Sequence, residues 1–283
     1  MDARLLELSP IVVIGMHRSG TRLLVEILDK LGVHMGADRQ GDAESVVFML
    51  INEDILHQCG AFWSEPMSAH FMLAQPEIVE QIAASADATL AAQLERYAGP
   101  SGWQLAKQFP AFGWKDPRNT FTLPVWKRVF PNLRTIHLVR HGVDVAASLA
   151  RRHAQALRAA TGESVPAALT VIRDHALGVL SSRRGWTLAE ALTMWEQYVE
   201  KAREECAALG ARALEVRYED LLTAPERTIP LVASFCGVAV PAQRAAMLEG
   251  LETGRAFAYR RDPDLAAFAG SVRDVLARYG YAA

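Results

Sequence analysis

The sequence has few cysteines and no long apolar run, and both features limit what the protein can be. Its three cysteines are Cys59, Cys206 and Cys236, and their wide spacing fits neither a disulfide framework nor a metal-ligand motif. We therefore expect buried structural thiols in a reducing compartment. No apolar stretch approaches the roughly 18 residues that cross a bilayer, and residues 1–10 show no secretory signal pattern. The sequence predicts a cytoplasmic protein without a membrane span.

An excess of charge of one sign is also missing. The chain has 30 lysine and arginine residues against 32 aspartate and glutamate residues, a formal net charge of −2. Proteins that bind nucleic acid normally carry clustered excess positive charge, so we expect no nucleic-acid partner. No repeat, low-complexity linker or composition break divides the chain, which predicts a single domain over residues 1–283.

Strands and helices alternate along the predicted fold. Short apolar runs typical of buried strands lie at 11–14, 113–115 (the end of a strand), 135–139 and 213–218. Apolar residues at helical spacing predict helices at 23–31, 42–98, 124–130, 146–153, 188–209 and 225–235. We expect a proline in the first turn of the helix at 124–130, and a mobile or partly helical insertion at 154–185. The alternation predicts an α/β fold with a mainly parallel central sheet and helices on both faces.

A glycine-containing loop connects the first predicted strand to the first predicted helix. It reads Gly15-Met16-His17-Arg18-Ser19-Gly20-Thr21-Arg22. Backbone N–H groups in such a turn, together with the positive end of the helix dipole, bind anions. The glycine spacing is that of the P-loop of nucleotide triphosphatases, but Thr21 stands at the lysine position. Arg22 stands where a hydroxyl would hold Mg²⁺, and a cation at that place argues against a divalent metal.

Here the chain resembles the sulfotransferases that use 3′-phosphoadenosine 5′-phosphosulfate (PAPS). Their 5′-phosphosulfate loop reads Pro-Lys-Ser-Gly-Thr-Thr or Pro-Arg-Ser-Gly-Thr-Thr. The resemblance implies that Arg18 contacts the leaving 5′-phosphate and the transferring sulfuryl group. The loop residues that it implies in donor binding are His17, Arg18, Ser19, Gly20, Thr21 and Arg22. Arg22 departs from the family's usual Ser or Thr.

A second family signature follows the predicted strand at 135–139. It reads Arg140-His141-Gly142-Val143-Asp144-Val145-Ala146-Ala147-Ser148. In the family, an arginine at the strand end and a serine eight residues later bind the 3′-phosphate, so the resemblance assigns this role to Arg140 and Ser148. A guanidinium offers phosphate a bidentate fork.

Further donor contacts are implied nearer the C-terminus. Tyr218 opens a Tyr-Glu-Asp-Leu segment, which the resemblance places beside the adenine, although a core aromatic is an alternative. Arg260 and Arg261 are the candidates for a late arginine on the 3′-phosphate. The resemblance is absent at 57–105 and 154–185, where acceptor-specific elements are expected.

A lysine ends the predicted strand at 113–115, in a Lys-Asp-Pro segment like that of the tyrosylprotein enzymes of the family. The resemblance implies that Lys115 donates to the bridging oxygen while charge builds on the leaving phosphate. The histidine base of the small-molecule enzymes is missing, with Pro117 in its place. Tyrosylprotein enzymes use a glutamate after the first helix, which makes Glu44 the candidate base. Its alternatives are Asp42, Asp38 and a histidine.

Together these signatures predict a sulfotransferase with PAPS as co-substrate, adenosine 3′,5′-bisphosphate (PAP) as product and no metal. The acceptor is a hydroxyl or amine of a small molecule, carbohydrate or peptide. Two alternatives stay open. One is a catalytically silent protein that binds PAPS or PAP, and the other is a phosphotransferase with a degenerate P-loop, which would need ATP and Mg²⁺.

Overall fold

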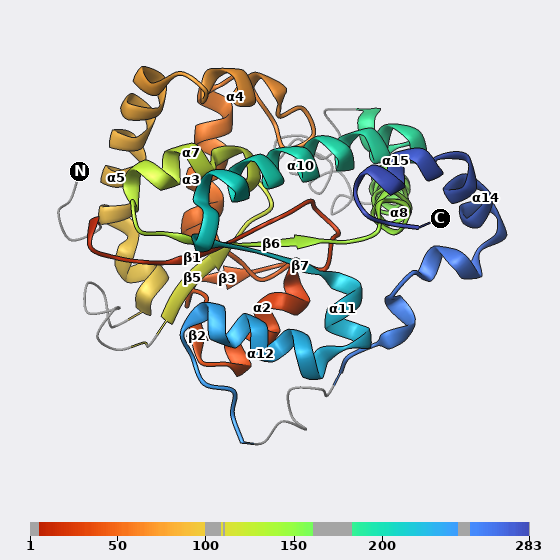
Figure 1. The fold of residues 1–283 in the computed structure, drawn as a ribbon. Helices are drawn as coiled ribbons and strands as arrows, with labels where there is room; N and C mark the ends of the chain where they lie inside the picture. Colours follow the sequence, from red (N-terminus) through yellow and green to blue (C-terminus); the bar gives the residue numbers. More distant parts are fainter. Residues whose placement is uncertain (1–5, 100–108, 110, 161–182, 243–249, 283) are drawn as a thin grey trace.

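The computed structural model describes residues 6–99, 109, 111–160, 183–242 and 250–282 (Figure 1). A five-stranded sheet in the order β2-β5-β1-β6-β7 forms the centre, and every neighbouring pair in it is parallel. Its strands are β1 (Ile11–Ile14), β2 (Val33–His34), β5 (Ala111–Lys115), β6 (Arg134–Val139) and β7 (Ala213–Arg217). Two short antiparallel strands, β3 (Arg39–Gln40) and β4 (Glu44–Ser45), form a second, separately hydrogen-bonded sheet. The predicted α/β fold class with a P-loop-like first strand, loop and helix is confirmed.

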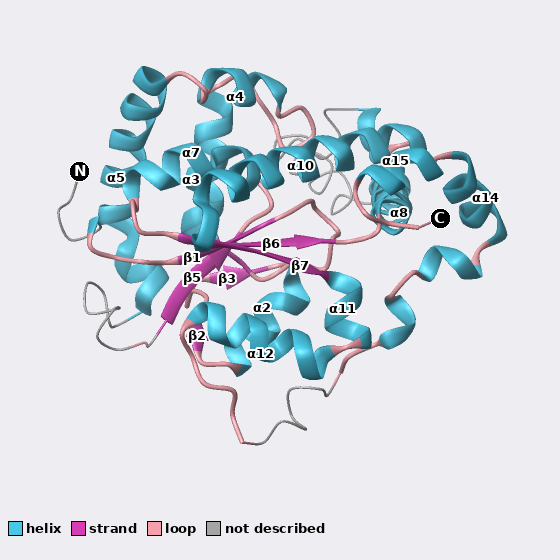
Figure 2. Ribbon diagram, viewed as in Figure 1, coloured by secondary structure: helices cyan, strands magenta, loops and turns pink. Residues whose placement is uncertain are grey.

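Helices cover both faces of the sheet (Figure 2). One face packs against α2 (Thr21–Lys30), α11 (Tyr218–Thr223) and α12 (Pro225–Cys236). The other face carries α3 (Val46–Gln58), α5 (Pro76–Ala98), α7 (Asn119–Val129), α8 (Gly142–Ala160) and α10 (Leu188–Leu209). Smaller elements are α4 (Met67–Met72), α14 (Pro263–Ser271), α15 (Arg273–Arg278), and the 3-10 turns η2 (Arg183–Gly185), η3 (Gly210–Arg212), η4 (Thr253–Arg255) and η5 (Ala258–Arg261).

The core is built on the alternation of side chains along each strand. In β1, Ile11 and Val13 belong to the apolar cluster under α2 and α12, while Val12 and Ile14 belong to the larger cluster on the opposite face. All four side chains are fully buried, which is why this strand reads as a continuous apolar run. None of the helices in the described part of the chain is long and apolar enough to span a membrane.

The sheet register brings four connections to one edge. Because the strands are parallel, their carboxyl ends all lie at that edge. Lys115, at the end of β5, is the partner of Val13 in β1, and Ile14 is the partner of His137 in β6. Val139 at the end of β6 is the partner of Arg217 at the end of β7. The residues that follow these strands therefore meet side by side.

Several predicted elements are confirmed, with differences at their ends. The strand at 11–14 and the helix at 188–209 have their predicted bounds. Strand β5 ends at Lys115 as predicted, and the helix predicted at 146–153 runs instead from Gly142 to Ala160. Of the insertion predicted at 154–185, residues 161–182 lie outside the described residues. Cys59 and Cys236 are buried free thiols, whereas Cys206 is half-buried.

Two helix predictions were wrong in detail. The stretch 42–98 is not one helical region, because Gly60 takes a positive φ of 62° after α3 and a proline marks the start of each of the next two helices. Pro124 does not open a helix at 124–130 but lies inside α7. That helix begins earlier, at Asn119, and just before it Asp116 accepts a hydrogen bond from the Arg118 N–H (2.9 Å).

Candidate functional site

The loop after β1 has an unusual backbone conformation at Gly15 and Arg18. Arg18 has a φ of 69°, in the left-handed region that side chains with a Cβ disfavour, so the loop holds this arginine in a strained conformation. Gly15 has a φ of 138°, and a Cβ there would lie 2.4 Å from the Leu138 carbonyl oxygen. The Gly15 N–H donates to Thr120 Oγ1 at 3.1 Å, which ties the start of the loop to α7.

The loop and the second signature are in direct contact. Arg18 Nε donates to Ser148 Oγ at 3.0 Å, and one terminal nitrogen of Arg18 lies 3.7 Å from Asp42. Arg140 donates from its guanidinium to the Arg18 carbonyl oxygen at 3.4 Å. Residues that the sequence analysis placed in two phosphate sites therefore line one continuous region.

Tyr218 lies between the loop and Arg140. A Cβ on Gly20 would lie 2.3 Å from carbons of the Tyr218 ring, so only glycine allows the ring to approach the loop this closely. The guanidinium carbon of Arg140 lies 4.6 Å from the ring centroid on a cation–π contact. This arrangement follows from the register, because Arg140 and Tyr218 come directly after paired residues of β6 and β7.

Asp144 brings the C-terminal segment to the same place. Its carboxylate accepts hydrogen bonds from the N–H groups of Ala258 (3.2 Å) and Tyr259 (2.8 Å), and it lies 3.5 Å from Arg140. Arg140 also donates to the Arg255 carbonyl oxygen at 3.1 Å. Asp144 thus orients the Arg140 side chain and holds the start of η5 close to it.

Lys115 and Glu44 form an ion pair at the other end of the edge, with Lys115 Nζ 3.0 Å from Glu44 Oε1. The Lys115 side chain is 1% exposed and that of Glu44 15%. Burial raises the pKa of Glu44 above its ordinary value of 4.5, and the charge of Lys115 opposes this rise. Lys115 is the last residue of β5 and Glu44 the first residue of β4, so the two short strands bring the ion pair together.

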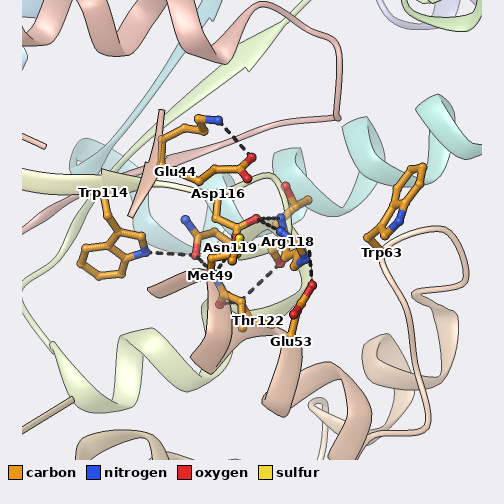
Figure 3. Close-up of polar contacts among 12 residues, drawn as sticks. Glu44, Met49, Glu53, Trp63, Trp114, Asp116, Arg118, Asn119 and Thr122 are labelled. Atoms are coloured by element: carbon orange, nitrogen blue, oxygen red, sulfur yellow. Dashed lines mark hydrogen bonds and ion pairs between the residues drawn. The ribbon is translucent and has the colours of Figure 1, made fainter. Parts of the chain in front are cut away.

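A buried polar network lies below this pair in Figure 3, which labels its members Asp116, Asn119 and Thr122. Asn52 of α3, which is also buried, joins them. The Asn52 amide group donates to Asp116 Oδ2 (3.0 Å) and to Asn119 Oδ1 (2.8 Å). Its oxygen accepts from Thr122 Oγ1 (2.6 Å) and Trp126 Nε1 (2.8 Å). Because Asp116 follows Lys115 directly, the network fixes the direction in which β5 ends.

We expect Asn52→Ala to lower the free energy of unfolding by about 2–4 kcal/mol, since it leaves several buried donors and acceptors without partners. Urea denaturation of the variant measures this loss. The matched control is Asn132→Ala, which removes one exposed hydrogen bond to the Leu6 carbonyl oxygen and should cost less than about 1 kcal/mol. Equal losses in the two variants would show that the network contributes nothing beyond a surface contact.

A cavity of about 780 Å³ joins these parts. The residues of the sequence predictions that line it are His17, Arg18, Gly20, Thr21, Arg22, Asp42, Glu44, Lys115, Arg140, Ser148 and Tyr218. Ser19, Asp38, Arg260 and Arg261 are not among its lining residues. Arg260 stacks on Phe257, 4.5 Å from its ring centroid, and Arg261 donates to the Gly254 carbonyl oxygen. Arg255, which the sequence analysis did not single out, lines the cavity in their stead.

The His17 side chain packs against the ring of Trp63. Its ring centroid lies 4.5 Å from that of Trp63, and its Nε2 is buried without a hydrogen-bond partner in the described part of the chain. Burial lowers the pKa of His17 well below 6.5, and the charges of nearby cations, above all Arg118 and Arg152, lower it further. His17 is therefore neutral at neutral pH and adds no positive charge to the cavity.

Other lining residues escaped the sequence analysis. Arg151, Arg152 and Gln155 continue the helix face that begins at Ser148. The sequence did offer a signal for them, because they lie three, four and seven residues after Ser148 and therefore on the same face of a helix. Trp63 and Asn52 were not predicted to have a role in the site, because their partners lie far along the chain.

Comparison with known proteins gives a match to the sulfotransferase family over residues 10–242. No curated protein sequence matches the chain. Similar solved structures include the sulfotransferase domain of the Synechococcus PCC 7002 olefin synthase, with 20% identity, a TM-score of 0.49, and coverage of 89% of this chain and 80% of that one. Sulfotransferase STF1 of Mycobacterium tuberculosis H37Rv has 15% identity, a TM-score of 0.46, and coverage of 85% and 71%. Mouse sulfotransferase SULT7A1, in complex with PAP, has 14% identity, a TM-score of 0.43, and coverage of 90% and 67%.

Proposed function

The chain belongs to the sulfotransferase family, and we propose that it transfers a sulfuryl group from PAPS to a hydroxyl or amine of an acceptor, releasing PAP. One observation carries the proposal. A single cavity joins the Lys115–Glu44 pair, the Arg18 loop and the Arg140–Tyr218 contact, in the order of strands β5, β1, β6 and β7. An elongated nucleotide with a phosphate at each end of its ribose fits this order.

A buried hydrogen-bond donor without a partner also supports a phosphate-containing ligand. Arg140 lines the cavity, and its Nε is buried without a hydrogen-bond partner among the residues described. Buried donors of this kind normally have partners, and phosphate oxygens supply them. In the proposed pose the adenine lies at Tyr218, the 3′-phosphate at Arg140 and Ser148, and the 5′-phosphosulfate at the loop beside Arg18 and Lys115.

In this pose Glu44 acts as the base, and Lys115 assists the departure of the leaving group. Glu44 accepts the proton of the acceptor O–H or N–H while the acceptor atom forms its bond to sulfur. The bond between sulfur and the bridging phosphate oxygen breaks, and its electron pair stays on the phosphate. Lys115 donates a hydrogen bond to that oxygen, and Arg18 stabilises the charge spread over the sulfuryl oxygens.

Glu44 is a better base than its acidic neighbours. Asp38 Oδ2 accepts hydrogen bonds from Ser45 Oγ (3.1 Å) and the Val47 N–H (2.8 Å), so this carboxylate serves the start of α3. The Asp42 side chain is 56% exposed. Glu44 is the carboxylate beside Lys115, and burial has raised its pKa toward the range that suits a general base.

The test of the proposed function has two steps. In a thermal-shift assay PAP and PAPS should raise the melting temperature, whereas ATP with Mg²⁺ should raise it little, because a ligand that binds the folded state stabilises it. Transfer of labelled sulfate from PAPS to an acceptor panel should then proceed in EDTA. Binding of PAP without turnover of any acceptor would favour a silent binding protein, and a dependence on ATP and Mg²⁺ would favour a phosphotransferase.

Arg140→Gln should weaken PAP binding by about 10- to 100-fold, since it removes charge-assisted hydrogen bonds to a phosphate. Calorimetric titration with PAP measures the effect. The matched control is Arg134→Gln at the opposite end of β6, where Arg134 donates to the Phe235 carbonyl oxygen at 2.7 Å. The control should keep the wild-type Kd. An unchanged Kd in Arg140→Gln would remove Arg140 from the donor site.

A further inference from the structure

The peptide bond between Arg140 and His141 is held at both of its polar atoms. Its carbonyl oxygen accepts from Trp195 Nε1 of α10 at 3.0 Å, and its N–H donates to Glu219 Oε1 of α11 at 2.9 Å. Neither of these two side chains lines the cavity. Because this peptide connects β6 to α8, the two hydrogen bonds fix the backbone that carries the Arg140 side chain.

Glu219 is a buried carboxylate that the proposed reaction does not use. The residue is 2% exposed, and burial raises its pKa above 4.5. Its second oxygen, Oε2, accepts from the Tyr281 hydroxyl at 3.1 Å. A buried carboxylate is costly unless its oxygens are hydrogen-bonded, and here one oxygen binds the His141 N–H while the other binds Tyr281. Glu219 therefore links the turn after β6 to the C-terminal segment.

Tyr281 is also held by contacts other than this hydrogen bond. Its N–H donates to the Leu276 carbonyl oxygen of α15 at 3.0 Å. Its ring lies edge-on to that of His141, with 5.0 Å between the centroids, and the guanidinium carbon of Arg217 lies 4.8 Å from its centroid. Removal of the hydroxyl alone should therefore leave the ring in place. Tyr281 lies outside the residues 10–242 that match the family.

We propose that Glu219 and Tyr281 are positioning residues for the 3′-phosphate of the donor, which fix the Arg140–His141 peptide so that the Arg140 guanidinium meets this phosphate. The inference rests on the proposed function, because it takes Arg140 as a ligand of the 3′-phosphate. A side chain that is fixed before binding loses less freedom when its ligand arrives. Without the bond to Glu219 the peptide can turn, so affinity falls only for nucleotides that carry a 3′-phosphate.

The test compares two nucleotides that differ only in the 3′-phosphate, PAP and adenosine 5′-monophosphate (AMP). Calorimetric titration of the full chain gives both Kd values, and the ratio of the Kd for AMP to the Kd for PAP measures what the 3′-phosphate contributes. Glu219→Leu should lower this ratio by about 10-fold and Tyr281→Phe by about 3-fold, the effects of one or part of one hydrogen bond. A merely structural role would weaken both nucleotides alike and leave the ratio unchanged.

Two further variants make the result specific. Glu219→Gln should recover most of the ratio that Glu219→Leu loses, because the amide oxygen can still accept from the His141 N–H. The matched control is Tyr279→Phe, which removes a hydroxyl that donates to Glu200 at 2.6 Å and should keep the wild-type ratio.

Tyr281→Phe keeps its ring, so it decides the question even if Glu219→Leu does not fold. An unchanged ratio in Tyr281→Phe overturns the inference, as does an equal fall of the ratio in Tyr279→Phe. A wild-type protein that does not bind PAP, or that binds PAP no more tightly than AMP, contradicts the proposed function itself.

Discussion

Glu44→Gln should lower kcat for sulfate transfer by about 10²–10⁴-fold while PAP affinity is retained, because a positioned general base contributes a factor of this size. Glutamine keeps the shape of the side chain and can still accept a hydrogen bond from Lys115, so the protein should fold. The measurement is the rate with labelled PAPS at saturating donor, together with the Kd for PAP.

The pH dependence of kcat gives a second readout of the same residue. Glu44 acts as a base only when ionised, and burial raises its pKa above 4.5. The wild-type kcat should therefore rise with pH through this raised pKa, and the rise should be absent in Glu44→Gln. Glu80→Gln, an exposed glutamate paired with Arg128, is the matched control and should keep both the rate and the pH profile. A larger loss in Asp42→Asn than in Glu44→Gln would move the base to Asp42.

Lys115→Met should lower kcat by about 10²–10³-fold, which is the usual loss when one donor to a developing oxyanion is removed. Methionine fills most of the volume of the lysine side chain, but the change leaves the buried carboxylate of Glu44 without its cation. The variant should therefore also melt at a lower temperature than wild type. Single-turnover transfer with PAPS measures the chemical step, and PAP binding shows that the site is intact.

A double variant separates the two effects of this substitution. Lys115→Met/Glu44→Gln should recover stability, because no unpaired buried charge remains, but it should not recover kcat. The matched control is Lys127→Met, at a lysine that pairs with Glu205 at 2.6 Å away from the cavity, and its kcat should stay at the wild-type value. If kcat returned together with stability in the double variant, Lys115 would have only a structural role.

The sequence predicted the parts of the site that depend on strand order and loop chemistry. Lys115, the loop at 15–20, Arg140 and Tyr218 follow four parallel strands, and a parallel sheet must bring such residues to one edge. For that reason local patterns were sufficient to group the first three, whereas Tyr218 was added by the resemblance. Glu44 and Lys115 were each assigned to the site by resemblance, and their ion pair was not predicted, because 71 residues separate the two in the chain.

The missing parts depend on contacts that no local pattern shows. Asn52 looks like an ordinary polar residue in an apolar helix, and its partners in α7 lie 67–74 residues further on. Arg260 and Arg261 were chosen as the late arginine by resemblance to the family's C-terminal basic segment. Asp144 accepts hydrogen bonds from the N–H groups at the start of η5, and Arg255 lines the cavity instead. The single domain over residues 1–283 and the cytoplasmic location stay predictions.

The most direct test of the account is a crystal structure of the protein with PAP bound. The account predicts the 5′-phosphate at the backbone N–H groups of Gly20 and Thr21 beside Arg18, and the 3′-phosphate within hydrogen-bonding distance of Arg140 and Ser148. PAP bound in the reverse direction along the sheet edge, or outside this cavity, would contradict it.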